Sequence, residues 1–110
     1  MLGLNSANKC PQIPEGFVLL RNEIVVVRKI NRLLSRCNQD THQPKKLELA
    51  LKSSDFYLTL LQTTSDNLVG FVRVTSDQGL NANLWDLVAE PGEQQETYMS
   101  IVVFLSLIHI

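Results

Sequence analysis

Cysteine is scarce in this chain, and an excess of charge of one sign is nearly absent. Cys10 and Cys37 are the only two cysteines among 110 residues, and their spacing lacks the close ligand pairs of a zinc knuckle. The formal net charge of -1 gives no general attraction to nucleic acid or to an anionic membrane surface. We therefore expect no metal site, no nucleic-acid partner and no membrane partner.

A targeting segment and a long apolar run are also missing. Residues 1–14 contain no basic stretch followed by an apolar run, so the sequence predicts no secretory signal. The apolar segment at residues 94–110 is too short for a bilayer span, which needs roughly 20 apolar residues. With both cysteines expected to be reduced, these absences predict a cytoplasmic protein.

What is present is the composition of one globular domain. Hydrophobic residues make up 45% of the chain and charged residues 19%, which is typical of a folded chain with a single core. We expect this domain to cover residues 16–110. Residues 1–15 are predicted to form an extended or disordered segment, and the oligomeric state is left open.

The first half of the chain predicts one strand and two helices. Residues 17–20 form a short apolar run typical of a buried strand, and Asn22 is expected to cap the helix that follows. Apolar residues then recur every three to four positions, which places them on one helix face: Ile24, Val27, Ile30, Leu34 and Cys37. The opposite face carries Arg28, Arg32 and Arg36, which we interpret as a solvated surface. Pro44 is expected to begin a second, shorter helix.

The second half predicts a meander of three strands and a helix. Strand-like segments at 56–61, 68–75 and 80–89 are separated by turn residues, as in consecutive antiparallel strands. The apolar segment at 94–110 is expected to be a buried helix, with a strand as the alternative because of its β-branched residues. Together these elements predict an α+β fold of the three-layer type, with a mainly antiparallel sheet of about four strands and two or three helices.

The second and third strands of this meander carry a specific run of residues. Residues 70–77 read Gly-Phe-Val-Arg-Val-Thr-Ser-Asp, and residues 81–86 read Asn-Ala-Asn-Leu-Trp-Asp, before the strand ends at Pro91. This hairpin resembles the GNAT superfamily of acyl-CoA-dependent N-acetyltransferases, in particular a subgroup known from photosynthetic lineages. The alternative is an ordinary hairpin with a buried tryptophan. The resemblance covers residues 17–103 and implies transfer of an acetyl group from acetyl-CoA to an amine of a small molecule or protein.

The resemblance also implies where acetyl-CoA binds. In the family, backbone groups at the end of the fourth strand pair with the pantetheine arm, which here places Leu87, Val88 and Ala89 against it. The pyrophosphate is held by a Gln/Arg-x-x-Gly-x-Gly/Ala turn at the start of a helix. Aligned on Pro91, that turn has Gln94 at its first position, followed by three further candidate positions: Gln95, Thr97 and Met99.

No glycine occurs in this turn, although glycine is what allows backbone to approach a phosphate closely. Side chains at Thr97 and Met99 are predicted to crowd the phosphate, and Glu93 and Glu96 bring negative charge beside an anionic ligand. We therefore expect the binding of acetyl-CoA to be weakened or lost. This absence favours an alternative function, a non-catalytic GNAT-like scaffold that binds a protein partner through the hairpin or the arginine face.

Asp86 is the candidate catalytic residue. A carboxylate on the fourth strand can relay the proton of the acceptor amine through water, and Asp86 is the carboxylate in place; a structural hydrogen bond is the alternative. Strand alternation predicts that Asp86 shares a face with Leu84 and Val88. Tyr98 is interpreted as a packing residue. The histidines, His42 and His109, are interpreted as incidental because neither has a partner at metal-binding spacing.

The end of the chain lacks the residues that normally terminate a helix. The resemblance then implies an incomplete GNAT-like fold, truncated after the fourth strand and the start of the helix that binds CoA. The final residues, 106–110, resemble the ending produced when a gene fragment is joined to unrelated sequence. We state as a hypothesis that Ser106 to Ile110 are not native.

Overall fold

The computed structural model describes residues 12–23, 27–77 and 81–108. Within these ranges the elements follow in this order: β1 (Phe17–Arg21), α2 (Val27–Arg36), α3 (Pro44–Ser53), β2 (Phe56–Gln62), β3 (Asn67–Ser76), β4 (Ala82–Ala89) and α4 (Gln95–Ile108). The final apolar segment is therefore a helix, and its alternative as a strand is wrong. Ile24, His109 and Ile110, and the predicted strand residue Leu80, lie outside the described residues.

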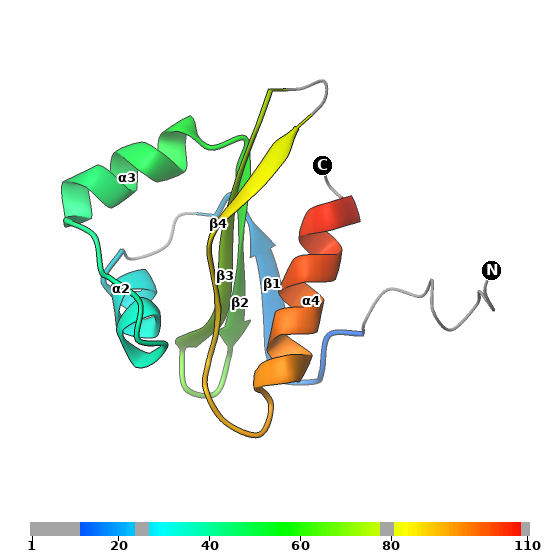
Figure 1. The fold of residues 1–110 in the computed structure, drawn as a ribbon. Coiled ribbons are helices and arrows are strands. Elements are labelled where there is room, and N and C mark those ends of the chain that lie inside the picture. The colour runs from blue at the N-terminus through cyan, green and yellow to red at the C-terminus, as the bar shows by residue number, and fades with distance from the viewer. Residues whose placement is uncertain (1–11, 24–26, 78–80, 109–110) are drawn as a thin grey trace.

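The strands form one antiparallel sheet in the order β1-β2-β3-β4. Figure 1 shows the sheet between two layers of helix, with α2 and α3 on one face and α4 on the other. The predicted α+β fold, with four antiparallel strands and three helices among the described residues, is confirmed. β4 is an edge strand of the described sheet, so one side of its backbone has no neighbouring strand there.

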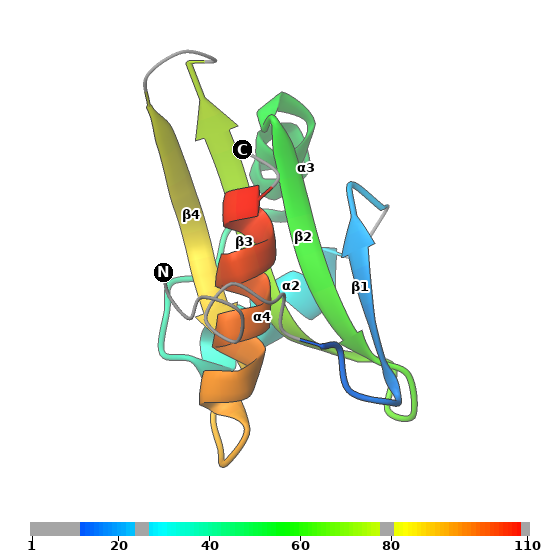
Figure 2. The same cartoon turned by 90° about the vertical axis from the view of Figure 1, so that its right-hand side faces the viewer.

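Two hydrophobic clusters lie on the two faces of the sheet, because successive strand residues point to opposite faces. The α4-side cluster joins Leu58 and Leu60 of β2 to Ile101 and Val102 of α4. The lengthwise course of α4 across this face is visible in Figure 2. The α2-side cluster joins Phe71 of β3 to the apolar stripes of α2 and α3. Burial on both faces therefore stabilises the same sheet.

The apolar stripe predicted for the first helix is confirmed for the residues that are described. Ile30 and Leu34 are fully buried in the α2-side cluster, and Cys37 packs against it. Arg28 and Arg32 lie on the solvent side, as expected. Asn22 differs from its predicted role as a helix cap. Its φ of 56° is left-handed, and its side-chain oxygen accepts from the Tyr57 backbone N–H at 2.9 Å.

Candidate functional site

A β-bulge in β4 sets the geometry of the candidate site. Val88 pairs with Phe71 and Trp85 pairs with Arg73, so Asp86 and Leu87 together oppose the single residue between those partners on β3. Asp86 adopts a left-handed φ of 55° at this position. A bulge inserts one residue and redirects side chains, which is the usual role of such irregularities near binding sites.

The bulge changes the face on which Asp86 lies. Leu84 and Leu87 pack against the α4-side cluster, whereas Val88 belongs to the α2-side cluster. Asp86 contacts residues of the α2 and α3 side, so its predicted sharing of a face with Leu84 is wrong, while that with Val88 is right. Simple alternation fails because the extra residue interrupts the period of two.

Asp86 is held between two basic side chains. His42, in the connection between α2 and α3, has its Nε2 3.1 Å from Oδ1 of Asp86. Arg73 of β3 donates from Nε to Oδ2 at 3.4 Å. The Asp86 side chain is 18% exposed, so these contacts lie at a partly desolvated position. A contact between this ring and an ionised carboxylate requires a proton on Nε2 of His42, because such a carboxylate only accepts hydrogen bonds.

Both basic partners are positioned by further contacts. The His42 backbone N–H donates to Asn31 Oδ1 at 2.9 Å, and Asn31 Nδ2 donates to the His42 carbonyl at 2.8 Å. The Arg73 guanidinium lies over the ring of Trp85, 5.8 Å from its centroid, and contacts the Ser54 hydroxyl at 3.4 Å. These contacts restrict the positions of His42 and Arg73 on either side of Asp86.

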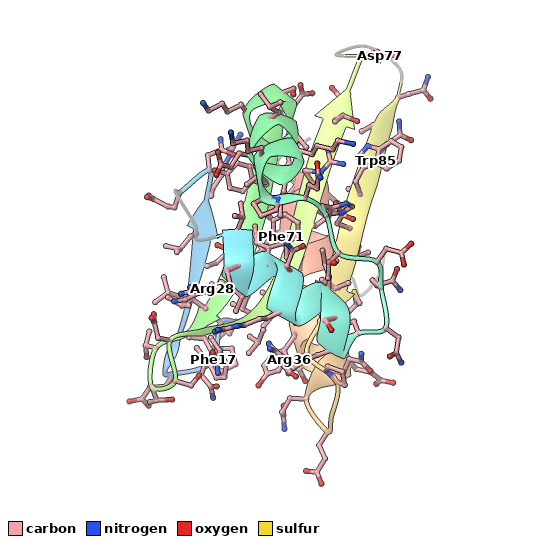
Figure 3. The ribbon with its side chains drawn as sticks, turned by 90° about the vertical axis from the view of Figure 1, so that its left-hand side faces the viewer. Phe17, Arg28, Arg36, Phe71, Asp77 and Trp85 are labelled. Carbon is pink, nitrogen blue, oxygen red and sulfur yellow. The ribbon has the colours of Figure 1, made fainter. Side chains whose placement is uncertain are left out.

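A pocket of about 190 Å³ opens beside this group. Its lining consists of His42, Lys46, Leu47, Ala50, Arg73 and Asp86. Helix α3 supplies Lys46, Leu47 and Ala50, which form the wall opposite the sheet. Figure 3 looks onto this side of the molecule and shows Trp85 on β4 beside α3. The described residues include no group of three or more His, Cys, Asp or Glu placed to hold a metal ion.

The end of β4 presents backbone groups at its open edge. Glu90 donates its backbone N–H to the Val69 carbonyl at 2.8 Å, while Ala89 is opposite Gly70. Hydrogen-bonded and non-hydrogen-bonded pairs alternate along an antiparallel ladder. The backbone N–H and carbonyl groups of Leu87 and Ala89 therefore point to the open edge, and the same groups of Val88 point toward β3. Of the three predicted residues, Val88 is directed away from a ligand at that edge.

Side chains already contact the Ala89 carbonyl. Gln95 Nε2 donates to it at 3.2 Å, and the Cys37 thiol lies 3.1 Å away. Burial raises the pKa of the Cys37 thiol above its usual 9.0, and the nearby Glu90 carboxylate adds to that increase. The same Glu90 is paired with Arg36 at 2.6 Å. Arg36, predicted to be only a solvated residue and labelled in Figure 3, thus links the end of α2 to Glu90, which follows β4.

The turn predicted to hold pyrophosphate leads into the first turn of α4. Gln94 accepts the backbone N–H of Tyr98 at 3.0 Å, so the helix begins directly after it. Thr97 is exposed in this first turn, whereas Met99 packs against the α4-side cluster. The Met99 side chain, predicted to crowd the phosphate, is therefore directed toward the sheet. Tyr98 is buried and lies 5.4 Å from the ring of Phe17, in agreement with its interpretation as a packing residue.

Sequence reasoning missed His42, Lys46 and Arg73 as neighbours of Asp86. His42 is separated from Asp86 by 44 positions, and nothing in the local pattern connects them. The interpretation of His42 as incidental is revised, because its ring contacts the predicted catalytic carboxylate. Arg73 belongs to the Gly70–Asp77 run, which indicates a family resemblance. The run alone does not show that the Arg73 side chain contacts Asp86.

Comparison with known proteins finds partial similarity to N-acetyltransferases. No family model matches the chain. The uncharacterized N-acetyltransferases ycf52 of Pyropia yezoensis and Porphyra purpurea are each 48% identical to it over 52 residues. That match covers 46% of this chain and 30% of the length of each relative.

The fold is also found in a solved structure. A protein of unknown function from meticillin-resistant Staphylococcus aureus, described as a probable acetyltransferase, aligns with a TM-score of 0.75. The alignment covers 86% of this chain and 68% of that protein at 20% identity, which shows a shared fold. Within the described residues, no helix has both the length and the apolar character needed to cross a membrane.

Proposed function

We propose that the chain is a GNAT-superfamily domain over residues 16–110, and that its site serves acetyl transfer from acetyl-CoA to an amine. The observation that carries this proposal is the bulge of β4. It directs Asp86 into the pocket and leaves the Leu87 and Ala89 backbone groups on an open edge. The partial similarity to ycf52 and the shared fold support the same reading.

In this proposal the open edge of β4 binds the pantetheine arm. An extended ligand that adds to a sheet edge is held by main-chain hydrogen bonds. The N–H and carbonyl of Leu87 and the N–H of Ala89 are suited to this role. The Ala89 carbonyl already accepts from Gln95 Nε2, so a ligand there competes with that side chain.

The start of α4 fits the pyrophosphate less well. The helix begins after Gln94, so its first turn offers backbone N–H groups and the positive end of the helix dipole to an anion. Glu93 and Glu96 are exposed beside this helix start, and their negative charges repel an anion such as the pyrophosphate. We infer that acetyl-CoA binds through the β4 edge with a weakened contribution from this turn.

The His42–Asp86 pair is proposed to remove the proton from the acceptor amine. An amine attacks a thioester carbonyl only when its nitrogen lone pair is free, so a base must accept the proton. With the proton on Nε2 directed to Asp86, Nδ1 of His42 is the accepting nitrogen. Asp86 then stabilises the imidazolium that forms, and Arg73 keeps the Asp86 carboxylate oriented.

Acetyl-CoA supplies the acyl group and the thiolate that leaves. The chain's own residues are proposed to orient the amine, accept its proton and keep the carboxylate in place. His42→Gln is expected to lower kcat by about 100-fold with little change in KM, because a positioned base contributes about 10²–10⁴-fold. The assay follows release of free CoA with a panel of amines, and an unchanged kcat would remove His42 from the mechanism.

Calorimetry with acetyl-CoA tests the binding part of the proposal. We expect binding weaker than micromolar for the natural sequence. Glu96→Gln is expected to tighten it by a factor of about 2–5, because one charge at a helix start contributes about 0.3–1 kcal/mol. Glu48→Gln, an exposed position on α3, is the matched control and should leave binding unchanged. Micromolar binding by the natural sequence would contradict the impaired turn.

The missing glycines favour a second candidate function, a non-catalytic scaffold that binds a protein partner. Thr97 stands exposed where the family has glycine, and two carboxylates lie beside it. This candidate function predicts that acetyl-CoA does not bind and that Glu96→Gln does not restore its binding. The same calorimetric series therefore separates the two functions.

A further inference from the structure

The charge of Asp86 is already compensated inside the pocket. Its Oδ1 is contacted by His42 and its Oδ2 by Arg73, at 3.1 and 3.4 Å. Each oxygen thus already faces one basic side chain, which weakens the attraction of Asp86 for the ammonium group of a cationic ligand. A polyamine, which is recognised best by carboxylates without basic neighbours, is therefore disfavoured by these lining residues.

Lys46, an exposed residue, brings a further positive charge to the lining of the same pocket. It lies on α3 and lines the pocket opposite Arg73 and Asp86. In the described part of the chain, its ammonium group takes part in no ion pair or side-chain hydrogen bond. With Arg73 balancing Asp86, Lys46 leaves the lining with an excess of positive charge even when His42 is neutral.

The size of the pocket limits what it accepts. A volume of about 190 Å³ is below the roughly 300–1,000 Å³ of sites for drug-sized ligands. Leu47 and Ala50 give part of the wall an apolar surface suited to a short methylene chain.

We propose that this pocket selects an acceptor that carries a carboxylate as well as its amine, such as a small amino acid. Lys46 binds the carboxylate, and the amine lies at the His42–Asp86 pair. The methylene groups between them contact Leu47 and Ala50. This inference rests on the proposed function, since it names the acceptor class for the same site.

The test compares three ligands with the same four-carbon chain on the 110-residue protein without acetyl-CoA. They are 4-aminobutyrate, 1,4-diaminobutane and 1-butylamine, and binding is followed by NMR shifts of the Asp86 amide and the Trp85 indole. We expect 4-aminobutyrate to bind most tightly and the diamine most weakly. Lys46→Gln should weaken the binding of 4-aminobutyrate about fivefold, because the ion pair of an exposed lysine contributes up to about 1 kcal/mol.

Lys45→Gln is the matched control, because Lys45 is exposed on α3 next to Lys46 and does not line the pocket. It should leave the affinity for 4-aminobutyrate unchanged. Equal binding of all three ligands, absence of binding by 4-aminobutyrate, or equal losses in the two lysine variants would overturn the inference.

Failure of the proposed acceptor class can be distinguished from failure of the proposed acetyl transfer. Selective binding of 4-aminobutyrate by a protein that does not bind acetyl-CoA rejects acetyl transfer and retains the ligand class. Acetyl transfer to the diamine in preference to 4-aminobutyrate supports the proposed function and rejects the ligand class.

Discussion

Thr59 of β2 is buried, with 1% of its surface exposed, and its hydroxyl has no hydrogen-bond partner among the described residues. A buried polar group without a partner costs free energy, because it has lost its hydrogen bonds to water. Thr59→Val keeps the shape of the side chain and removes the hydroxyl. We expect it to raise the free energy of unfolding by about 1 kcal/mol, measured by urea denaturation.

The control for this prediction is Thr75→Val on β3. The Thr75 hydroxyl accepts from Trp85 Nε1 at 2.8 Å, so the same substitution there removes a partner. It should lower the free energy of unfolding. A change of the same sign in both variants would contradict the explanation from hydrogen bonding.

The thiol of Cys37 predicts a loss of stability at alkaline pH. Burial and Glu90 raise its pKa above 9.0 in the folded protein, so the unfolded chain loses this proton first as the pH rises. The free energy of unfolding is therefore unaffected by Cys37 below about pH 9 and decreases as the pH rises through the folded pKa. Tyr57, whose pKa burial raises above 10.0, acts in the same direction.

Urea denaturation between pH 7 and 11 measures this effect in a Cys10→Ser background. Adding Cys37→Ser keeps a donor near the Ala89 carbonyl and removes the ionisation, so the decrease above pH 9 should become smaller. Identical pH profiles with and without Cys37 would show that its thiol does not contribute.

At the scale of elements, the packing of α4 on the sheet depends on Gly70 of β3. A Cβ atom at Gly70 would lie 2.7 Å from Cγ2 of Val102 and 3.3 Å from Cβ of Leu60. Valine is stiff at χ1 and cannot easily withdraw its methyl group. Gly70→Ala is therefore expected to lower the free energy of unfolding by about 1–3 kcal/mol, as overpacked cores do.

A double-mutant cycle with Val102→Ala tests this contact. The second substitution removes the clashing methyl group, so the double variant should be more stable than the sum of the two single effects predicts. Additive effects would mean that Gly70→Ala acts through strand propensity and not through α4.

The β4 element shows why one irregularity matters for the site. Without the bulge, Asp86 would follow Leu84 to the α4 side and have no contact with His42. With it, Trp85 and Asp86 both lie on the side of α3, where their partners Arg73 and His42 are found. The position of the candidate catalytic carboxylate is therefore a property of the strand pairing.

At the scale of the molecule, both hydrophobic clusters pack on one sheet. Loss of packing on one face weakens the support for the other, so we expect a single cooperative unfolding transition. Leu34→Ala, at a fully buried position of α2, should lower the free energy of unfolding by about 2–5 kcal/mol. Trp85 fluorescence and far-UV circular dichroism should show the same shifted midpoint.

Leu49→Ala is the matched control on α3, because Leu49 is 65% exposed. It should change stability by no more than about 0.5 kcal/mol. Separate midpoints for the two probes in the Leu34→Ala protein would contradict the coupling of the two faces.

Fold and sequence similarity differ in extent across the molecule. The sequence match to ycf52 covers 46% of the chain, whereas the structural match covers 86%. The structural match, which is to a different protein at 20% identity, therefore extends over more of the chain than the sequence match does. Fold tolerates exchange of apolar residues of similar pattern, while a site depends on particular side chains.

The sequence by itself determined the order and type of the elements. Helix periodicity in 27–37 and the strand-like segments between turns are local signals, and local sequence is sufficient to read them. The candidate carboxylate, Asp86, was also visible, because it lies in a recognisable run. The resemblance that this run carries also singled out residues 87 and 89, which lie at the end of β4.

Only the tertiary structure decided which side chains meet. The bulge that redirects Asp86, the orientation of Val88 toward β3 and the packing of Met99 in the core follow from strand register and from helix docking. His42 reaches Asp86 across 44 positions because α2 and α3 pack on the face to which the bulge turns the carboxylate. Such contacts depend on the whole arrangement of the chain, and no local pattern encodes them.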